Sequence, residues 1–191
     1  MKTFNYHSAK DVKKAIPSLA ALAEGIGDPQ VRNRGTIGGS IANNDPAADY
    51  PSACIALNAI IHTNNRKINA DKFFTGMFET SLKSSEIIEA IEFNIPQKSS
   101  YQKLPNPASR YAIVGVYVAK HKSGVNVGVT GAKSCVYSDK DIAATLSNNF
   151  SSSAIDNVKI STSGMNSDIH ASAEYRANMV KAFAKKAVDA C

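Results

Sequence analysis

The sequence predicts an α+β protein, in which helices occur together with hairpin-connected strands. Two strand-like runs, residues 111–120 and 125–132, are separated by the short turn Lys122-Ser-Gly, which is typical of an antiparallel pair. Residues 171–190 predict a helix, because their apolar residues recur at helical spacing: Tyr175, Met179, Ala182, Phe183 and Val188. Asp45-Pro46 predicts a further helix start, with an N-cap followed by proline at the first helical position.

The N-terminal part of the chain has shorter elements. Phe4 and Tyr6 alternate with polar residues, which predicts a strand. Apolar residues recur at helical spacing over residues 12–22, but Pro17 interrupts them. Proline cannot continue a helix without a kink, so we expect two short helices or one kinked helix here.

A polar, proline-rich stretch, residues 96–107, separates the two halves of the sequence. We therefore expect two domains, residues 1–96 and residues 97–191. The other predicted elements are a helix over 45–61, strands near 60–63 and 66–68 around Asn64-Asn65, a strand over 87–95, a third C-terminal strand near 134–137, and a helix over 140–146.

Composition excludes several classes of protein. With 191 residues, 43% of them hydrophobic and 20% charged, the chain can bury a real core and is not a disordered protein. The net charge is +6, but the lysines are scattered and no basic run is interleaved with aromatic residues. The sequence therefore does not predict nucleic-acid binding.

The three cysteines, Cys54, Cys135 and Cys191, are far apart and include no CxxC pair. This pattern argues against a disulfide framework, a zinc site or an iron–sulfur cluster, and Cys54 is expected to be a small core residue. No stretch has the length needed to span a bilayer, and the start lacks an apolar segment of signal-peptide length. We expect a cytoplasmic protein.

The segment over residues 25–51 is the best candidate for a binding site, because glycines and polar residues replace the apolar pattern there. Gly38-Gly39 would let a ligand approach the backbone, and Thr36 and Ser40 add hydroxyls beside it. Asp49 could accept hydrogen bonds from ligand hydroxyls. The alternative is an ordinary turn, in which Arg32 and Arg34 only pair with Asp28 and Asp45. The residues alone leave both interpretations open.

A family resemblance favours the binding site. Residues 30–43, Gln-Val-Arg-Asn-Arg-Gly-Thr-Ile-Gly-Gly-Ser-Ile-Ala-Asn, followed by Asp-Pro-Ala-Ala-Asp-Tyr-Pro at 45–51, resemble the second flavin motif of the medium subunits of the carbon monoxide dehydrogenase and xanthine dehydrogenase family. Further segments that resemble the family are residues 73–80, 86–88, 101–103, 111–116 and 167–176.

The resemblance implies a fold and a site. Residues 1–96 would be the second subdomain of an FAD-binding domain of the PCMH type, and residues 97–191 a domain like the C-terminal domain of the carbon monoxide dehydrogenase flavoprotein, with an antiparallel sheet and helices. The family's FAD contacts fall on Ile26, Thr36, Ile37, Gly38, Gly39, Ser40, Asp49, Ile88 and Lys103. Ile88 and Lys103 would lie near the isoalloxazine ring, where a cation favours the reduced, anionic flavin. Without the resemblance, Ile88 is better interpreted as a core strand residue and Lys103 could be a solvated lysine.

The resemblance also implies a role as an electron relay. In the family, a molybdenum-cofactor large subunit oxidises the substrate, an iron–sulfur small subunit passes the electrons on, and the flavin subunit delivers them to an external acceptor. The chain would thus belong to a hetero-oligomer. No general acid or base is needed, which agrees with the lack of a catalytic constellation in the sequence.

The sequence departs from the family at one point. Residues 1–10 resemble the family's start, but residues 12–19 already resemble the helix before the second motif, so the subdomain with the first pyrophosphate-binding loop is missing. Because one of two phosphate-binding loops is gone, we expect FAD binding to be weakened or lost. The alternative function is a remnant without flavin that acts only as a subunit-docking module.

Overall fold

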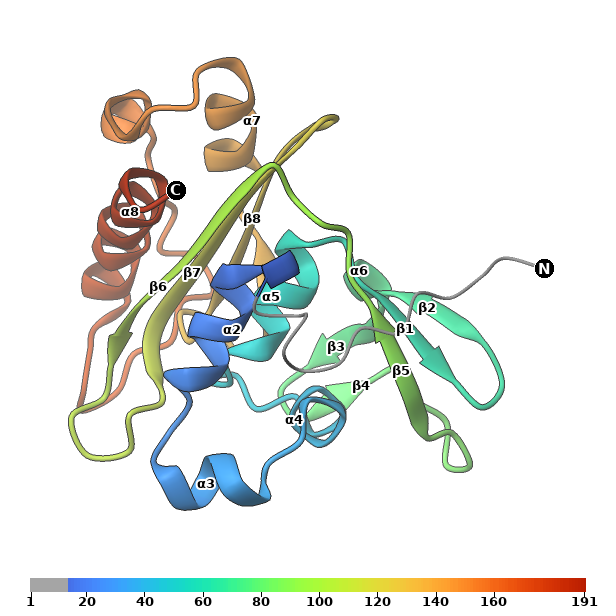
Figure 1. Ribbon diagram of the computed structural model, residues 1–191. Helices are drawn as coiled ribbons and strands as arrows, with labels where there is room; N and C mark the ends of the chain where they lie inside the picture. Colours follow the sequence, from blue (N-terminus) through green and yellow to red (C-terminus); the bar gives the residue numbers. More distant parts are fainter. Residues whose placement is uncertain (1–13) are drawn as a thin grey trace.

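A computed structural model of the chain describes residues 14–191. The strand predicted around Phe4 and Tyr6 lies outside the described residues. Across the described part, helices and antiparallel sheets alternate along the chain, so the predicted α+β class is confirmed (Figure 1).

A four-stranded antiparallel sheet forms the centre of the molecule. Its strands are β6 (Lys98–Pro105), β7 (Ala112–His121), β8 (Gly124–Thr130) and β9 (Tyr137–Ser138), in the order β6-β7-β8-β9. The predicted hairpin and the third strand are therefore confirmed. Strand β6 lies in the polar stretch that we interpreted as the boundary between two domains. An edge strand can carry polar side chains and end at a proline.

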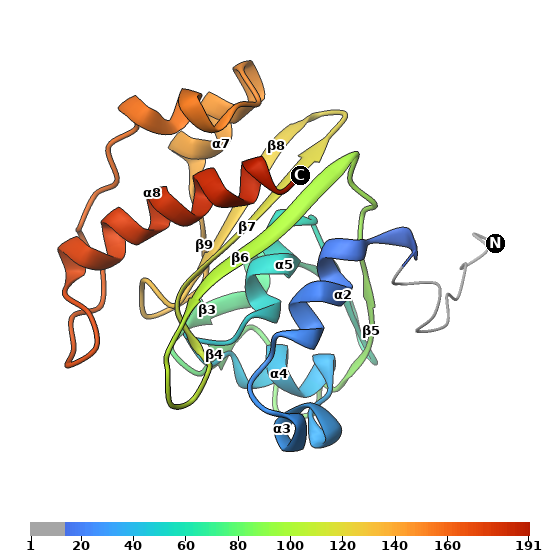
Figure 2. The same ribbon diagram turned by 60° about the vertical axis from the view of Figure 1, so that its left-hand side comes forward.

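Helices cover both faces of this sheet (Figure 2). Helices α8 (Ala173–Asp189) and α7 (Lys140–Asn148) pack on one face, whereas α2 (Pro17–Glu24) and α5 (Tyr50–Ala56) pack on the other. Alternate residues of β7 are buried in two different cores: Val116 and Val118 face α8, and Tyr117 faces α2 and α5. Strand β7 is therefore buried on both faces and has a nearly continuous apolar sequence.

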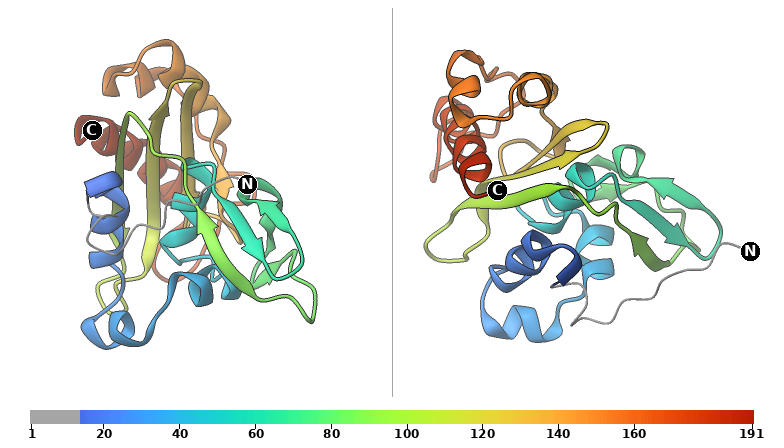
Figure 3. Two further views of the ribbon diagram at one scale, coloured as in Figure 1. Left: turned by 45° about the vertical axis from the view of Figure 1, so that its right-hand side comes forward. Right: turned by 45° about the horizontal axis from the view of Figure 1, so that its top comes forward.

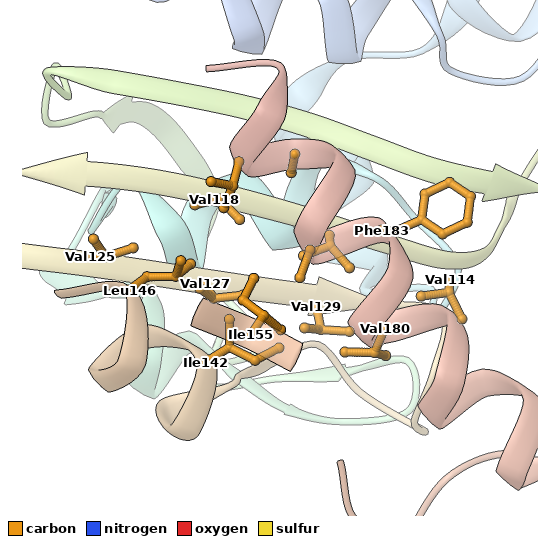
Figure 4. Close-up of a cluster of buried hydrophobic side chains, with 14 of the residues drawn as sticks. Val114, Val118, Val125, Val127, Val129, Ile142, Leu146, Ile155, Val180 and Phe183 are labelled. Carbon is orange, nitrogen blue, oxygen red and sulfur yellow. The ribbon is translucent and has the colours of Figure 1, made fainter. Parts of the chain in front are cut away.

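The core under α8 is made of aliphatic side chains. Val180 and Phe183 of α8 share one cluster with valines of β7 and β8, and Ile155 of the short helix η1 (Ser152–Asn157) belongs to the same cluster (Figure 4). The predicted stripe on α8 is wrong at Tyr175, which is 42% exposed.

A smaller sheet extends from the side of the central one (Figure 3). Its antiparallel order is β2 (Lys67–Asn69), β1 (Ile60–Thr63), β5 (Ile88–Glu92). Ile61 lies opposite both Ile68 and Ile91, so the predicted hairpin is in register. Helix α6 (Ala70–Phe73) leads into a hairpin of β3 (Phe74–Gly76) and β4 (Glu79–Thr80).

Prolines begin helices at two places. Residues 14–15 are helical and Ile16 is not, so Pro17 separates two helical segments by starting α2. The helix predicted over 45–61 is wrong at both ends. Asp45 Oδ1 accepts a hydrogen bond from Ala47 N at 2.8 Å, which closes a turn instead of capping a helix, and α5 starts at Tyr50.

The division after residue 96 stays a prediction. Leu19 of α2 and Leu57 after α5, which precede it, share a core with Tyr117 of β7, which follows it. This shared core fixes the segment over residues 25–51 against the central sheet.

Candidate functional site

The segment over residues 25–51 contains two short helices, although glycines and polar residues interrupt the apolar pattern of the sequence there. Helix α3 (Pro29–Arg34) is capped by Asp28, and helix α4 (Ile37–Asn43) is capped by Thr36, whose Oγ1 accepts a hydrogen bond from Gly39 N at 3.0 Å. Gly38 and Gly39 are thus in the first turn of α4. The Gly-Gly pair therefore begins a helix and does not form an ordinary turn, and Thr36 already satisfies the N–H of Gly39.

A cavity of about 470 Å³ lies between α3, α4 and the start of α5. Five of the predicted site residues line it: Ile26, Thr36, Gly39, Ser40 and Asp49. They come from a segment of 24 residues, from Ile26 to Asp49. Asn44 ends α4 with a left-handed backbone (φ 46°), and the chain reverses direction there. The structure therefore brings most of the predicted set together around one open volume.

Asp49 is the buried charge of this cavity. Asp49 is only 4% exposed. It is the N-cap residue of α5, but its carboxylate makes no capping hydrogen bond. Instead it reaches β6, where Tyr101 Oη donates to Oδ1 and Lys103 Nζ lies 2.8 Å from Oδ2. Burial raises the pKa of Asp49 above its ordinary value, and the charge and hydrogen bonds of Lys103 and Tyr101 oppose that rise.

Lys103 is a paired residue. Its side chain is 12% exposed, and Nζ also donates to the backbone oxygen of Gly25 at 2.8 Å. This contradicts the interpretation of Lys103 as a solvated lysine. Lys103 lies beside Asp49, on the side of the carboxylate that faces β6, and joins β6 to the end of α2.

Ile37, Gly38 and Ile88 lie on the other side of α4. A Cβ built on Gly38 would lie 4.0 Å from Cγ2 of Ile88, so these two residues are neighbours across α4 and β5. Ile88 is half-buried against the core that contains Ile41 and Phe73. None of these three is among the residues that line the 470 Å³ cavity.

Several lining residues were not among the predicted site residues. Arg34 and Tyr111 line the cavity, as does Arg32, whose guanidinium donates to the backbone oxygens of Ile26 at 2.8 Å and Gly27 at 3.2 Å. In the alternative interpretation, Arg32 would pair with an acidic side chain. In the structure, these backbone oxygens hold its guanidinium group. Arg32 and Arg34 belong to the same sequence motif as Thr36. Their position in that motif was the signal that could have identified them as site residues.

The donor set fits a ligand that carries phosphates and hydroxyls. Hydroxyls from Thr36 and Ser40, two guanidinium groups and the carboxylates of Asp45 and Asp49 surround the cavity, and Gly39 contributes no side chain to fill it. Guanidinium groups suit phosphate, and a buried carboxylate suits sugar-type hydroxyls. Over residues 14–191 no group of three His, Cys, Asp or Glu side chains could hold a metal ion. No helix in the same range is long and apolar enough to cross a membrane.

Comparison with known proteins decides the family. The sequence profile described as "FAD binding domain in molybdopterin dehydrogenase" matches residues 3–98. The chain belongs to this family. The nicotine 6-hydroxylase medium subunit of Paenarthrobacter nicotinovorans is 31% identical over 191 residues, which cover 93% of this chain and 68% of that protein.

A further relative agrees with this result, and a solved structure supports the fold. The carbon monoxide dehydrogenase medium chain of Hydrogenophaga pseudoflava is 38% identical over 129 residues, covering 63% of this chain and 44% of its own length. The structure of reconstituted CO dehydrogenase from Oligotropha carboxidovorans superposes with a TM-score of 0.85 at 24% identity, covering 95% of this chain and 69% of that one, and supports the fold. The predicted family, its cofactor FAD and the assignment to an oxidoreductase subunit are confirmed.

Proposed function

We propose that this chain is the electron-relay subunit of a molybdenum hydroxylase, and that it holds FAD in the cavity between α3, α4 and α5. The observation that carries the proposal is the convergence of Thr36, Gly39, Ser40 and Asp49 on one cavity of about 470 Å³. When bound, FAD would supply the redox chemistry. The chain's own residues would bind, orient and tune it.

Each predicted residue has a physical role in this proposal. Thr36 and Ser40 would donate hydrogen bonds from their hydroxyls, and the bare backbone at Gly39 would allow close approach. Asp49 would accept hydrogen bonds from the ribityl hydroxyls. Ile26 would supply apolar contact from the cavity wall, and Lys103 would add a positive charge behind Asp49. Ile37, Gly38 and Ile88 lie on the other side of α4, so they would only hold that helix in place.

The proposed partners are a molybdenum-cofactor large subunit and an iron–sulfur small subunit in a cytoplasmic hetero-oligomer. The relatives' description as medium subunits or chains supports this arrangement. The free thiols of Cys54, Cys135 and Cys191 support a reducing compartment. FAD affinity in the isolated chain would be reduced, because the sequence lacks the family's first phosphate-binding loop.

A potentiometric titration tests the relay. FAD would be added to the protein in an anaerobic cell, and its midpoint potential would be compared with that of free FAD. We expect a shift to higher potential, because the positive charge of Lys103 favours the reduced, anionic form, and we expect Lys103→Met to lower it again. A midpoint potential equal to that of free FAD in both proteins would overturn the proposed tuning.

A further inference from the structure

Tyr101 connects the central sheet to the charged residue of the cavity. Its hydroxyl donates a hydrogen bond to Asp49 Oδ1 across 52 positions of sequence. Its ring stacks on Tyr117 of β7, with centroids 6.0 Å apart and an interplanar angle of 30°. Tyr101 is not one of the residues that line the cavity, so it would act through Asp49.

Gly115 makes this contact possible. Gly115 lies opposite Lys103 in the β6–β7 register, and a Cβ at position 115 would overlap the Tyr101 hydroxyl and lie 3.0 Å from Cζ of its ring. Glycine weakens the interior of a strand, so its place here marks a close approach of another group. That group is the Tyr101 side chain as it leans toward Asp49.

A second set of hydrogen bonds holds the stacked partner. Tyr117 is fully buried, and its hydroxyl lies 2.5 Å from Ser18 Oγ, which lies 2.7 Å from Ser99 Oγ. The Tyr117 ring is therefore fixed between α2 and β6. Since Tyr101 stacks on a fixed ring, the direction of its own hydroxyl is fixed as well.

We propose that Tyr101 is a positioning residue of the FAD site, which holds the Asp49 carboxylate in one orientation so that its free lone pairs face the cavity. This inference rests on the proposed function. A carboxylate accepts about four hydrogen bonds. Tyr101 and Lys103 take one on each oxygen, so the remaining acceptor sites are available to the hydroxyls of a ribityl chain.

Several charged and titratable groups surround Asp49. Lys103 and Tyr101 face it from β6, and Tyr50 adjoins it on α5. On the cavity side, Arg32 and Arg34 of α3 and Asp45 line the same volume. Burial raises the pKa of Asp49, and the hydrogen bond from Tyr101 lowers it, so loss of the hydroxyl leaves a carboxyl that protonates at higher pH.

The test compares Tyr101→Phe with Tyr117→Phe. Both variants lose one tyrosine hydroxyl and keep the stacked rings, but only the first loses the bond to Asp49. The titration of Asp49 would be followed in the flavin-free protein by NMR of ¹³C-labelled aspartate. FAD affinity would be measured over a pH series by quenching of flavin fluorescence. Gly115→Ala is a second variant that displaces the hydroxyl without removing it.

We expect Tyr101→Phe to raise the pKa of Asp49 and to weaken FAD binding by about tenfold, with the acid limb of the binding curve moved to higher pH. Gly115→Ala should change both readouts in the same direction, and Tyr117→Phe should change neither. An unchanged Asp49 titration in Tyr101→Phe would overturn the inference. Wild-type protein that binds no FAD at any pH would overturn the proposed function, while the Asp49 titration would still decide whether Tyr101 holds the carboxylate.

Discussion

Asp49 and Lys103 form a buried ion pair, with Oδ2 and Nζ 2.8 Å apart, although they are 54 positions apart in the sequence. The pair joins the start of α5 to β6, and the bond from Lys103 to Gly25 extends it to the end of α2. A single lysine thus connects three elements that surround the cavity.

Lys103→Met should destabilise the protein by about 3 kcal/mol near neutral pH, because it leaves a buried carboxylate without its counter-ion. The pKa of Asp49 in the folded protein already lies above its ordinary value because of burial, and the substitution raises it further. A carboxyl with a raised folded pKa contributes stability that is lost as pH rises through that pKa. The difference between the variant and the wild type should therefore grow with pH.

Urea unfolding of both proteins at a series of pH values measures this difference. Below about pH 4 the Asp49 carboxyl is protonated in both proteins. The remaining difference in the free energy of unfolding should then come only from the lost packing of Lys103 and its lost hydrogen bond to Gly25. A difference in the free energy of unfolding that stays constant from acid to neutral pH would show that Lys103 does not stabilise the charged form of Asp49.

Arg176→Met should cost about 3 kcal/mol of stability, because the substitution leaves buried backbone oxygens without a donor. The Arg176 side chain is 5% exposed and donates to the oxygens of Ile113 at 2.6 Å and Gly131 at 3.0 Å. Lys185→Met is the control, since Lys185 makes an exposed pair with Asp156 and should show no measurable loss. Equal losses in urea unfolding would contradict the structural role of Arg176.

Thr36→Ala should lower the free energy of unfolding by about 1 kcal/mol, because it removes the N-cap of α4. Thr36→Ser keeps the oxygen that accepts the hydrogen bond from Gly39 N, and should keep most of the stability. Thermal unfolding monitored by circular dichroism compares the three proteins. If serine and alanine gave the same melting temperature, the cap would not be the reason for the loss.

Gly128→Ala should destabilise the protein by about 2 kcal/mol or more, because a Cβ there would overlap the backbone oxygen of Ser52. Gly128 is where β8 packs closely on α5. Gly25→Ala is a matched control, since its Cβ would lie 3.5 Å from the nearest atom and meet only ordinary contact. We expect the control to remain within about 0.5 kcal/mol of wild type in urea unfolding. A stable Gly128→Ala protein would mean that α5 and β8 can move apart.

The elements that the sequence predicted well are those with a strong local pattern. Residues 111–120 form a long apolar run, residues 125–129 alternate, and Asn64-Asn65 marks a tight turn, so both hairpins were found. The helix over 45–61 failed because Asp45 resembles a helix cap but closes a turn through Ala47, a choice that depends on packing of the following residues.

The site was predicted in part for a similar reason. Thr36, Gly39, Ser40 and Asp49 belong to one continuous motif, so a sequence comparison could place them together. The partners of Asp49 come from β6, in a polar stretch with no strand pattern, and the burial of Arg176 depends on oxygens from β7 and the turn after β8. Such contacts arise only when distant strands pair.

A fluorescence titration of FAD with the purified protein tests the central claim most directly. It would be run with wild type, with Ser40→Leu, which places a bulky side chain at the cavity wall, and with Ser153→Leu, at an exposed serine of η1. We predict saturable one-to-one quenching that Ser40→Leu abolishes and Ser153→Leu leaves unchanged. No saturable quenching by wild type, or equal quenching by Ser40→Leu, would contradict a flavin site between α3, α4 and α5.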